Sequence, residues 1–288
     1  MIQTHLDCLE KTLEDLLTPP DGPYSYIFEA ARYSLLSPGK RVRPLLTIAS
    51  GEAFGASIEK TLFPACAIEM IHTYSLIHDD LPCMDDDDLR RGKPTLHLVY
   101  PEGQAVLAGD LLLTRSFETL AASPNLKAQQ IVDMIAILSK QAGGMGMIGG
   151  QSLDLSSENK QIPWETLEHI HIGKTSALLS ASLEIGGIAA EVSSSFRRQL
   201  CQLGQTIGLS FQIIDDILDV EGSQGLLGKP IGSDQNNNKV TSVSLLGLRN
   251  AKKLAEDLLR TSLELCRKMD IAQSDLAQML PRLVHRNF

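Results

Sequence analysis

The 288-residue sequence predicts an all-α protein, and three observations support this fold class. Apolar residues recur at helical steps of three and four through nearly the whole chain, as in Ile2, Leu6, Leu9 and Leu13. No run of alternating apolar and polar residues flanked by hairpin dipeptides occurs, so strands have little support. Most prolines fall between the periodic segments, where a missing N–H group costs least.

The first half of the chain is predicted to form five helices, with turn residues between them. The leucine stripe of 2–17 stops at two consecutive prolines. Helix 24–36 is followed by a Ser-Pro-Gly turn, after which helix 42–54 begins. Helix 61–81 runs up to a proline, and helix 103–122 begins after another.

The second half is predicted to form five more helices. Helix 126–143 follows a proline and repeats isoleucine, methionine and leucine at helical spacing. Helix 164–189 also follows a proline and contains the most apolar region of the chain. Helix 195–219 precedes a polar, glycine-rich loop, 241–268 follows that loop, and 272–285 carries a stripe of leucine and methionine.

Two of these segments, 61–81 and 195–219, are nearly uniform in apolar content, so we expect them to be central helices surrounded by the others. No composition shift or flexible linker divides the chain. We therefore expect one domain over residues 1–288, built of about ten or more helices.

Composition limits the classes of partner. Lys and Arg number 26 against 35 Asp and Glu, which gives a formal net charge of −9. Binding to nucleic acid through phosphates needs a basic surface, so we expect no nucleic-acid partner. The five cysteines are scattered without a CxxC pair, as is typical of a reducing compartment. The chain has no signal-peptide start and no stretch of 18 apolar residues, so we expect a cytoplasmic protein without a stable membrane span.

Two clusters of carboxylates lie at the ends of apolar segments. Their members are Asp79, Asp80 and Asp85, followed by Asp215, Asp216 and Asp219. On a helix Asp215 and Asp219 lie about 40° apart, and Pro82 should turn the first helix end so that Asp79 and Asp85 face one point. Hard divalent cations offset crowded carboxylates, and oxygen-only ligands favour Mg²⁺ over zinc. We expect a phosphate-bearing substrate between the clusters, although the run 85–88 by itself could be a solvated helix end.

Cationic residues gather at a few places against this acidic background. They are Gly39-Lys40-Arg41-Val42-Arg43, Arg90-Arg91, Lys174, Lys229 and Lys239. Arginine forks bind phosphate oxygens bidentately, and lysine supplies a point charge. Each cation alone is more often a surface residue, but together with two metal-type clusters they indicate an anionic substrate.

Four strings, DDLPCMDDDDLRRGK, GGQSLDL, FQIIDDILD and SPGKRVRP, resemble the short-chain trans-polyprenyl diphosphate synthases, most closely the bacterial-type farnesyl diphosphate synthases. The resemblance runs from about Tyr24 to Leu248, and along the chain the strings occur in the order that the family shows. The resemblance implies an isoprenoid-synthase-type helical bundle around a central cavity, and usually a homodimer. It also implies a Mg²⁺-dependent prenyltransferase that condenses isopentenyl diphosphate with dimethylallyl and then geranyl diphosphate to give farnesyl diphosphate.

The resemblance further implies roles for individual residues. Three Mg²⁺ ions would bind at Asp79, Asp85 and Asp215, with support from Asp80, Asp216 and Asp219. The allylic diphosphate would contact Arg90, Lys174 and Lys229, and isopentenyl diphosphate would contact Gly39, Lys40, Arg43, His72 and Arg91. Oxygens of Lys174, Thr175 and Gln212 would face the allylic cation, and Lys239 would belong to a closing loop.

Product length is expected to depend on the residues just before Asp79, where the prenyl tail would grow along the helix. Tyr74 lies five residues before Asp79 and Ser75 four before. An aromatic residue at this place, with the two extra residues Cys83-Met84 in the motif, resembles the farnesyl-producing pattern. Tyr74 could also be an ordinary core aromatic, and a geranylgeranyl diphosphate synthase is the alternative within the family.

Three other interpretations stay open. His78-Asp79 is an HD dipeptide as in helical metal phosphohydrolases, with His72 and His171 as further ligands. A terpene cyclase would share the ionisation step but has no use for the Lys40, Arg43 and His72 site. A non-catalytic subunit would normally have lost aspartates from one motif. One departure from the family pattern, Thr241-Ser242-Val243 after Lys239, alters a helix start but no ligand.

Overall fold

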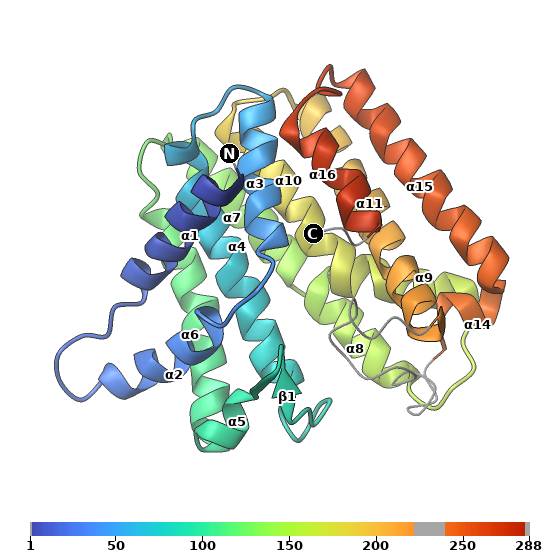
Figure 1. Cartoon of the computed structure of the whole chain (residues 1–288). Helices are drawn as coiled ribbons and strands as arrows, with labels where there is room; N and C mark the ends of the chain where they lie inside the picture. The colour runs from blue at the N-terminus through green and yellow to red at the C-terminus, as the bar shows by residue number, and fades with distance from the viewer. Residues whose placement is uncertain (1, 222–239, 286–288) are drawn as a thin grey trace.

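The computed structural model describes residues 2–221 and 240–285, and these residues are almost entirely helical (Figure 1). The helices in the first half are α1 (Ile2–Leu16), α2 (Ser25–Leu35), α3 (Val42–Ala53), α4 (Ile58–Asp79), α5 (Leu96–Val99), α6 (Glu102–Ala121) and α7 (Ala128–Ala142). Those in the second half are α8 (Met147–Ser157), α9 (Trp164–His171), the π-turn η1 (Ile172–Ser176), α10 (Ala177–Ala189), α11 (Ser194–Glu221), α14 (Ser242–Leu246), α15 (Leu248–Lys268) and α16 (Asp275–Val284). The all-α prediction is confirmed, and the predicted residues Lys229 and Lys239 lie outside the described residues.

A two-stranded hairpin departs from the expectation that the chain has no strands. β1 (Leu89–Arg90) pairs antiparallel with β2 (Lys93–Pro94). Arg91 and Gly92 between them have φ of 55° and 78°, and two positive φ angles in a two-residue loop match the twist of a hairpin. The hairpin directly follows the first carboxylate cluster and carries Arg90.

The structure differs from the predicted helices in three segments. After predicted helix 126–143, four turn residues lead into α8, a helix that the sequence pattern did not predict. Segment 241–268 is divided into α14 and α15 at Gly247, whose φ is 76°. Segment 164–189 is helical throughout, but η1 interrupts its α-helical hydrogen bonding between α9 and α10.

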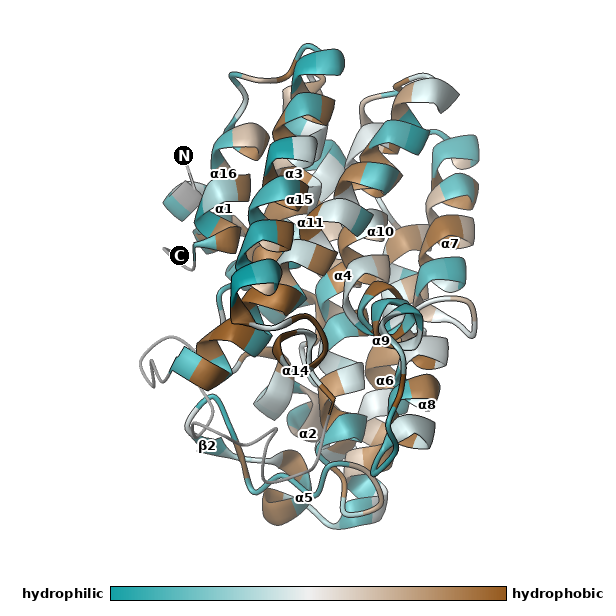
Figure 2. Ribbon diagram, turned by 90° about the vertical axis from the view of Figure 1, so that its right-hand side faces the viewer, coloured by the Kyte–Doolittle hydropathy of each residue, from teal (hydrophilic) through white to brown (hydrophobic). Residues whose placement is uncertain are grey.

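The most enclosed helix is α10, in which every residue is buried. It packs against α3, α4, α7 and α11. α4 is central as predicted, but α11 exposes Gln202 and Gln205 and so is amphipathic rather than enclosed. Glycine permits α10 and α11 to pack closely, since a Cβ on Gly204 of α11 would lie 2.3 Å from Ser180 Cα of α10. Along the outer helices teal and brown residues alternate, as helices with one buried face require (Figure 2).

One stretch of the described residues, 128–157, is long and apolar enough to cross a membrane by length and composition alone. It is not one continuous helix, because α7 ends at Ala142 and α8 begins at Met147. α7 is also bonded to the bundle: Gln130 donates to Ile188 O at 2.7 Å, and Asp133 pairs with Arg197 at 2.7 Å. In its apolar 18-residue window 28% of the residues are buried, and the stretch exposes Val132, Met145 and Ile148.

Candidate active site

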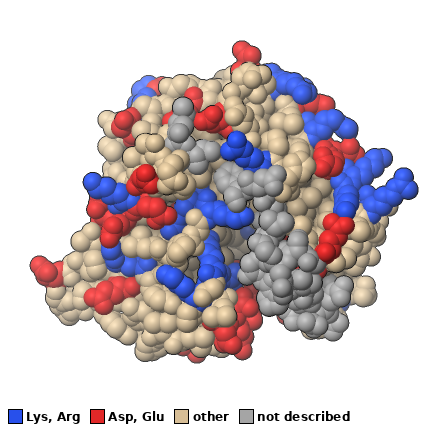
Figure 3. Space-filling view, viewed as in Figure 1, with Lys and Arg blue, Asp and Glu red and all other residues tan. Residues whose placement is uncertain are grey.

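A cavity of about 820 Å³ lies among α3, α4, α6, α8 and η1. Seven of the predicted site residues line it, namely Arg43, His72, Tyr74, Ser75, Asp79, Lys174 and Thr175. On the face shown in Figure 3, Lys and Arg side chains gather in the hollow near its middle. The cavity therefore combines cations, one half-buried carboxylate and a largely apolar interior.

Asp79 is the last residue of α4 and faces the cavity. The chain turns back directly after it, because Asp85 N donates to Asp79 O at 2.9 Å and Met84 N donates to Leu81 O at 2.8 Å. This turn brings Asp85 beside Asp79, as the proline between them predicts. Burial raises the pKa of Asp79 to about 6, and the negative charge of Asp85 adds to that increase while Lys174 opposes it.

Asp80 points away from this pair and binds Arg90 of the hairpin. Arg90 Nε donates to Asp80 Oδ1 at 2.9 Å, its Nη2 also contacts that oxygen, and Nη2 donates to Asp87 at 3.0 Å. Burial raises the pKa of Asp80 although Arg90 opposes the rise, and the paired carboxylates carry the pKa of Arg90 above its ordinary value against its own burial. Arg90 is therefore a fixed cation at the mouth of the first cluster.

The π-turn η1 places Lys174 and Thr175 at the cavity. Lys174 Nζ donates to Asp154 of α8 at 2.7 Å, and Thr175 Oγ1 donates to Gln212 Oε1 of α11. Burial lowers the pKa of Lys174, but Asp154 and Asp79 more than compensate, so its pKa lies above the usual value and the ammonium stays charged. Asp154, which the sequence analysis did not single out, belongs to the quoted string GGQSLDL.

The second cluster lies near the carboxyl end of α11. Asp216 is buried, and its Oδ2 accepts from Ser242 N at 2.6 Å and lies 3.6 Å from His171 Nε2. Asp219 is buried and Asp215 half-buried. In the described ranges no three or more His, Cys, Asp or Glu side chains come close enough to hold one metal ion, so the carboxylates of the two clusters do not form a closed cage.

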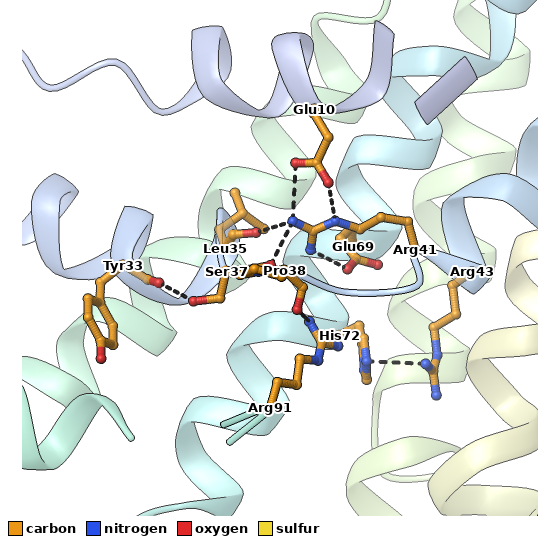
Figure 4. A network of polar contacts seen from close by, with 10 residues as sticks. All are labelled: Glu10, Tyr33, Leu35, Ser37, Pro38, Arg41, Arg43, Glu69, His72 and Arg91. Carbon is orange, nitrogen blue, oxygen red and sulfur yellow. Dashed lines mark hydrogen bonds and ion pairs between the residues drawn. The ribbon is translucent and has the colours of Figure 1, made fainter. Parts of the chain in front are cut away.

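Arg43 and His72 meet at another part of the cavity wall (Figure 4). Arg43 Nη1 lies 3.2 Å from His72 Nε2, and because arginine can only donate, the histidine accepts and is neutral. Burial and then Arg43 hold the pKa of His72 well below its usual value, and burial lowers the pKa of Arg43 to about 10. Arg43 Nε is buried without a hydrogen-bond partner among the described residues. A buried donor without a partner costs free energy that an anion in the cavity would recover.

Gly39, Lys40 and Arg91 lie next to this pair. The guanidinium of Arg91 approaches Gly39 so closely that a Cβ there would lie 2.3 Å from its Nη1, and Nη1 donates to Pro38 O at 3.4 Å. Lys40 is exposed. Arg43, His72 and Arg91 are therefore brought together beside Gly39, and of the five predicted residues of this subsite only Arg43 and His72 line the cavity.

Tyr74 and Ser75 also line the cavity, one turn before Asp79. The Tyr74 side chain is 5% exposed, its ring stacks edge-on against His78, and its hydroxyl is buried without a partner in the described part of the chain. Ser75 Oγ donates to His72 O at 2.9 Å, so its hydroxyl is occupied. Gln151 of α8, which the sequence analysis did not single out, lines the cavity, and both ends of its buried amide lack a hydrogen-bond partner among the described residues.

A family model for polyprenyl synthetase matches residues 24–279. The chain belongs to this family. Over 239 residues, 82% of this chain and 81% of the relative, it is 48% identical to farnesyl diphosphate synthase of Haemophilus influenzae. It is 43% identical to geranylgeranyl diphosphate synthase of Cyanophora paradoxa over 288 residues, 99% of this chain and 96% of the relative. The crystal structure of a Helicobacter pylori geranyltransferase with magnesium and isoprenyl diphosphate matches with a TM-score of 0.87 and 36% identity, covering 99% and 96% of the two chains.

As a polyprenyl synthetase, the protein is a prenyltransferase. The histidines proposed for a phosphohydrolase do not assemble one metal centre. His72 accepts from Arg43, His78 contacts Val106 O at 3.0 Å, and His171 lies beside Asp216. The family and this geometry together exclude the HD interpretation.

Proposed function

We propose that this polyprenyl synthetase is a farnesyl diphosphate synthase, which condenses isopentenyl diphosphate with dimethylallyl and then geranyl diphosphate. One observation carries the proposal: a single cavity of about 820 Å³ is lined both by Asp79 and Lys174, called here the Asp79–Lys174 pair for their opposite charges, and by the hydrogen-bonded Arg43–His72 pair. Two diphosphates repel each other, so each needs its own set of cations. The apolar space between the two pairs is suited to the prenyl chains that must react.

The carboxylates fit Mg²⁺ bound together with substrate. Burial and neighbouring carboxylates raise the pKa of Asp79, so a divalent cation there relieves an unfavourable charge. Mg²⁺ keeps several waters and binds through one or two carboxylates plus substrate phosphates, which suits two open clusters. Bound there, it supplies charge for the departing diphosphate. We assign three ions to Asp79, Asp85 and Asp215, with Asp80, Asp216 and Asp219 around them.

The cations of the chain bind and orient the two diphosphates. Lys174 and Arg90, both held by carboxylates, contact the allylic diphosphate and stabilise the charge that develops as it leaves. Isopentenyl diphosphate binds at the other group, where Arg43 Nε is a buried donor without a partner in the described residues. The members of this group are Gly39, Lys40, Arg43, His72 and Arg91. Lys229 and Lys239 are assigned to the allylic diphosphate and a closing loop by resemblance alone.

The reaction itself needs little from protein side chains. Loss of the allylic diphosphate leaves a carbocation, the alkene of isopentenyl diphosphate attacks it, and the released proton passes to the departed diphosphate. Oxygens of Lys174, Thr175 and Gln212 face the cation, and the Thr175–Gln212 hydrogen bond orients two of these residues. Water would convert the cation to an alcohol, and apolar wall residues such as Leu113 and Met147 exclude it.

One incubation tests the proposal. Purified protein is mixed with Mg²⁺, labelled isopentenyl diphosphate and either dimethylallyl or geranyl diphosphate, and the dephosphorylated products are separated by chromatography. We expect farnesol as the main product. Geranylgeraniol as the main product would agree with the family but contradict the assigned chain length. The relative from Cyanophora paradoxa, a geranylgeranyl diphosphate synthase, is the reason to look for this product. Release of diphosphate without an elongated chain would contradict the synthase.

We also propose that two copies of the chain associate. Exposed apolar side chains lie on α6, on α7, in the turn after α7 and at the start of α8. They are Val106, Leu107, Val132, Met145 and Ile148. A surface of this kind is usually covered, and most such assemblies are two-fold dimers.

A further inference from the structure

Arg41 separates two residues assigned to isopentenyl diphosphate, Lys40 and Arg43, yet its side chain turns away from the cavity. It is 2% exposed and points into the interface between α1 and α4 (Figure 4). Its backbone, at the N-cap of α3, has φ 47° and ψ 37°, in the left-handed region that a non-glycine residue seldom adopts. Such a conformation costs free energy and persists only where surrounding contacts enforce it.

The guanidinium of Arg41 makes contacts that enforce this conformation. Its Nη1 donates to Glu69 of α4 at 2.8 Å, and its Nε donates to Glu10 of α1 at 2.8 Å. Its Nη2 donates to Leu35 O at 2.8 Å, to Ser37 O at 3.1 Å and to Glu10 at 3.2 Å. The two carboxylates raise the pKa of Arg41 against the effect of its burial, so the network is held by a permanent charge.

The two carbonyl contacts fix the course of residues 36–40, which contain Gly39 and Lys40. Ser37 Oγ further donates to Tyr33 O at 2.6 Å, and Arg91 donates to Pro38 O. The contact of Arg91 with Gly39 leaves no space for even a Cβ atom. A shift of this segment therefore changes the distance between Arg91 and the backbone that it faces.

We propose that Arg41 is a positioning residue for the isopentenyl diphosphate subsite, held in place by Glu10 and Glu69. It touches no substrate, and it acts through the segment 37–40 and through Arg91. The inference rests on the proposed function, because the subsite takes its name from that reaction. It predicts an effect on one of the two diphosphates only, since the Asp79–Lys174 pair has no contact with this network among the described hydrogen bonds.

The test compares Arg41→Lys and Glu10→Ala with Glu14→Ala. Lysine keeps a charge beside Glu69 but has no planar fork to bind two carbonyls and Glu10 together. Glu14 is the matched control, because it also lies on α1 and pairs with an arginine of α2, Arg32, at 3.0 Å, but does not contact residues 36–40. KM is measured separately for isopentenyl and geranyl diphosphate, together with kcat and Tm.

We expect Arg41→Lys to raise KM for isopentenyl diphosphate about tenfold, which corresponds to about 1.4 kcal/mol, and to leave KM for geranyl diphosphate within about twofold. Glu10→Ala should shift the same constant in the same direction, and Glu14→Ala should shift neither. Equal rises in both KM values, or a loss of Tm with both KM values unchanged, would overturn the inference. If Arg41→Lys does not fold, the comparison of Glu10→Ala with Glu14→Ala decides in the same way. A wild-type enzyme that makes no elongated product would refute the proposed function itself, which separates the two failures.

Discussion

We expect Asp79 to lower the stability of the metal-free protein, although the proposed reaction needs its carboxylate. Burial raises its pKa from 3.8 to about 6, so between these values the folded protein binds a proton more tightly than the unfolded chain does. The stability of the metal-free protein therefore falls as pH rises from about 4 to about 6, and this loss persists at higher pH. In the proposed function this carboxylate binds a metal ion, which would offset the destabilisation that it causes in the metal-free protein.

This reasoning predicts the behaviour of Asp79→Asn. In a chelating buffer at pH 8 the variant should have a higher Tm than wild type, because it lacks the unfavourable charge, while its activity is lost. The difference in Tm should shrink at pH 5, where the wild-type carboxyl is protonated in the fold. Thermal unfolding at the two pH values measures it. Identical Tm values at pH 8 would contradict the assignment.

Tyr74 determines product length if it forms the floor of the cavity. The alanine variant removes the ring that closes the space one turn before Asp79, so we expect products of twenty carbons and longer. The phenylalanine variant keeps the ring and should still give farnesyl diphosphate. Chromatography of the products compares the two. If the alanine variant still stops at fifteen carbons, the floor lies elsewhere.

Some site residues are predictable from the sequence, and Arg41 shows why others are not. Asp79 and Arg43 stand in strings that resemble the family, and the structure places both at the cavity. Arg41 and Arg43 share one string and one chemistry, yet they point in different directions. The left-handed backbone at Arg41 decides this, and it depends on Glu10 and Glu69, which are distant in sequence.

At the scale of elements, the crossing of α8 and η1 holds Lys174 beside its counterion. Gly150 of α8 lies against the π-turn, and a Cβ there would lie 2.1 Å from Lys174 N. Gly150→Ala should push the two elements apart, weaken the Asp154–Lys174 pair and reduce kcat at least about tenfold, as small misplacements of binding groups do. The matched control is Gly144→Ala in the preceding turn, where nothing lies within 4 Å. Equal activity of both variants would contradict this role for the crossing.

The same crossing explains why the sequence pattern missed α8. Glycine weakens a helical periodicity, and residues 143–150 contain five glycines, so the segment was not among the predicted helices. In the fold, Gly150 is needed because of the backbone that faces it, a contact made across more than twenty residues. Helix 2–17, whose leucine stripe depends only on local spacing, was predicted nearly to its ends.

At the scale of the whole molecule, the exposed apolar surface of α6 and α7 should be covered by a second chain. We expect light scattering to give twice the 31.4 kDa chain mass for the wild type. Val132→Lys places a charge in this surface and should shift the mass toward one chain. Thr261→Lys, at an exposed position of α15, is the control and should leave the mass unchanged. A wild-type protein of single-chain mass would contradict the assignment.

The π-turn has a consequence for how this chain can change over generations. A π-turn is equivalent to one residue inserted into an α-helix, and each helical residue rotates the chain by about 100°. The wider turn absorbs that residue, so deleting one residue from Ile172–Ser176 would restore regular α-helix and remove the turn that places Lys174 and Thr175 at the cavity. Single-residue deletions that surface loops tolerate should therefore be eliminated from residues 172–176, because they displace the side chains that this segment presents to the cavity.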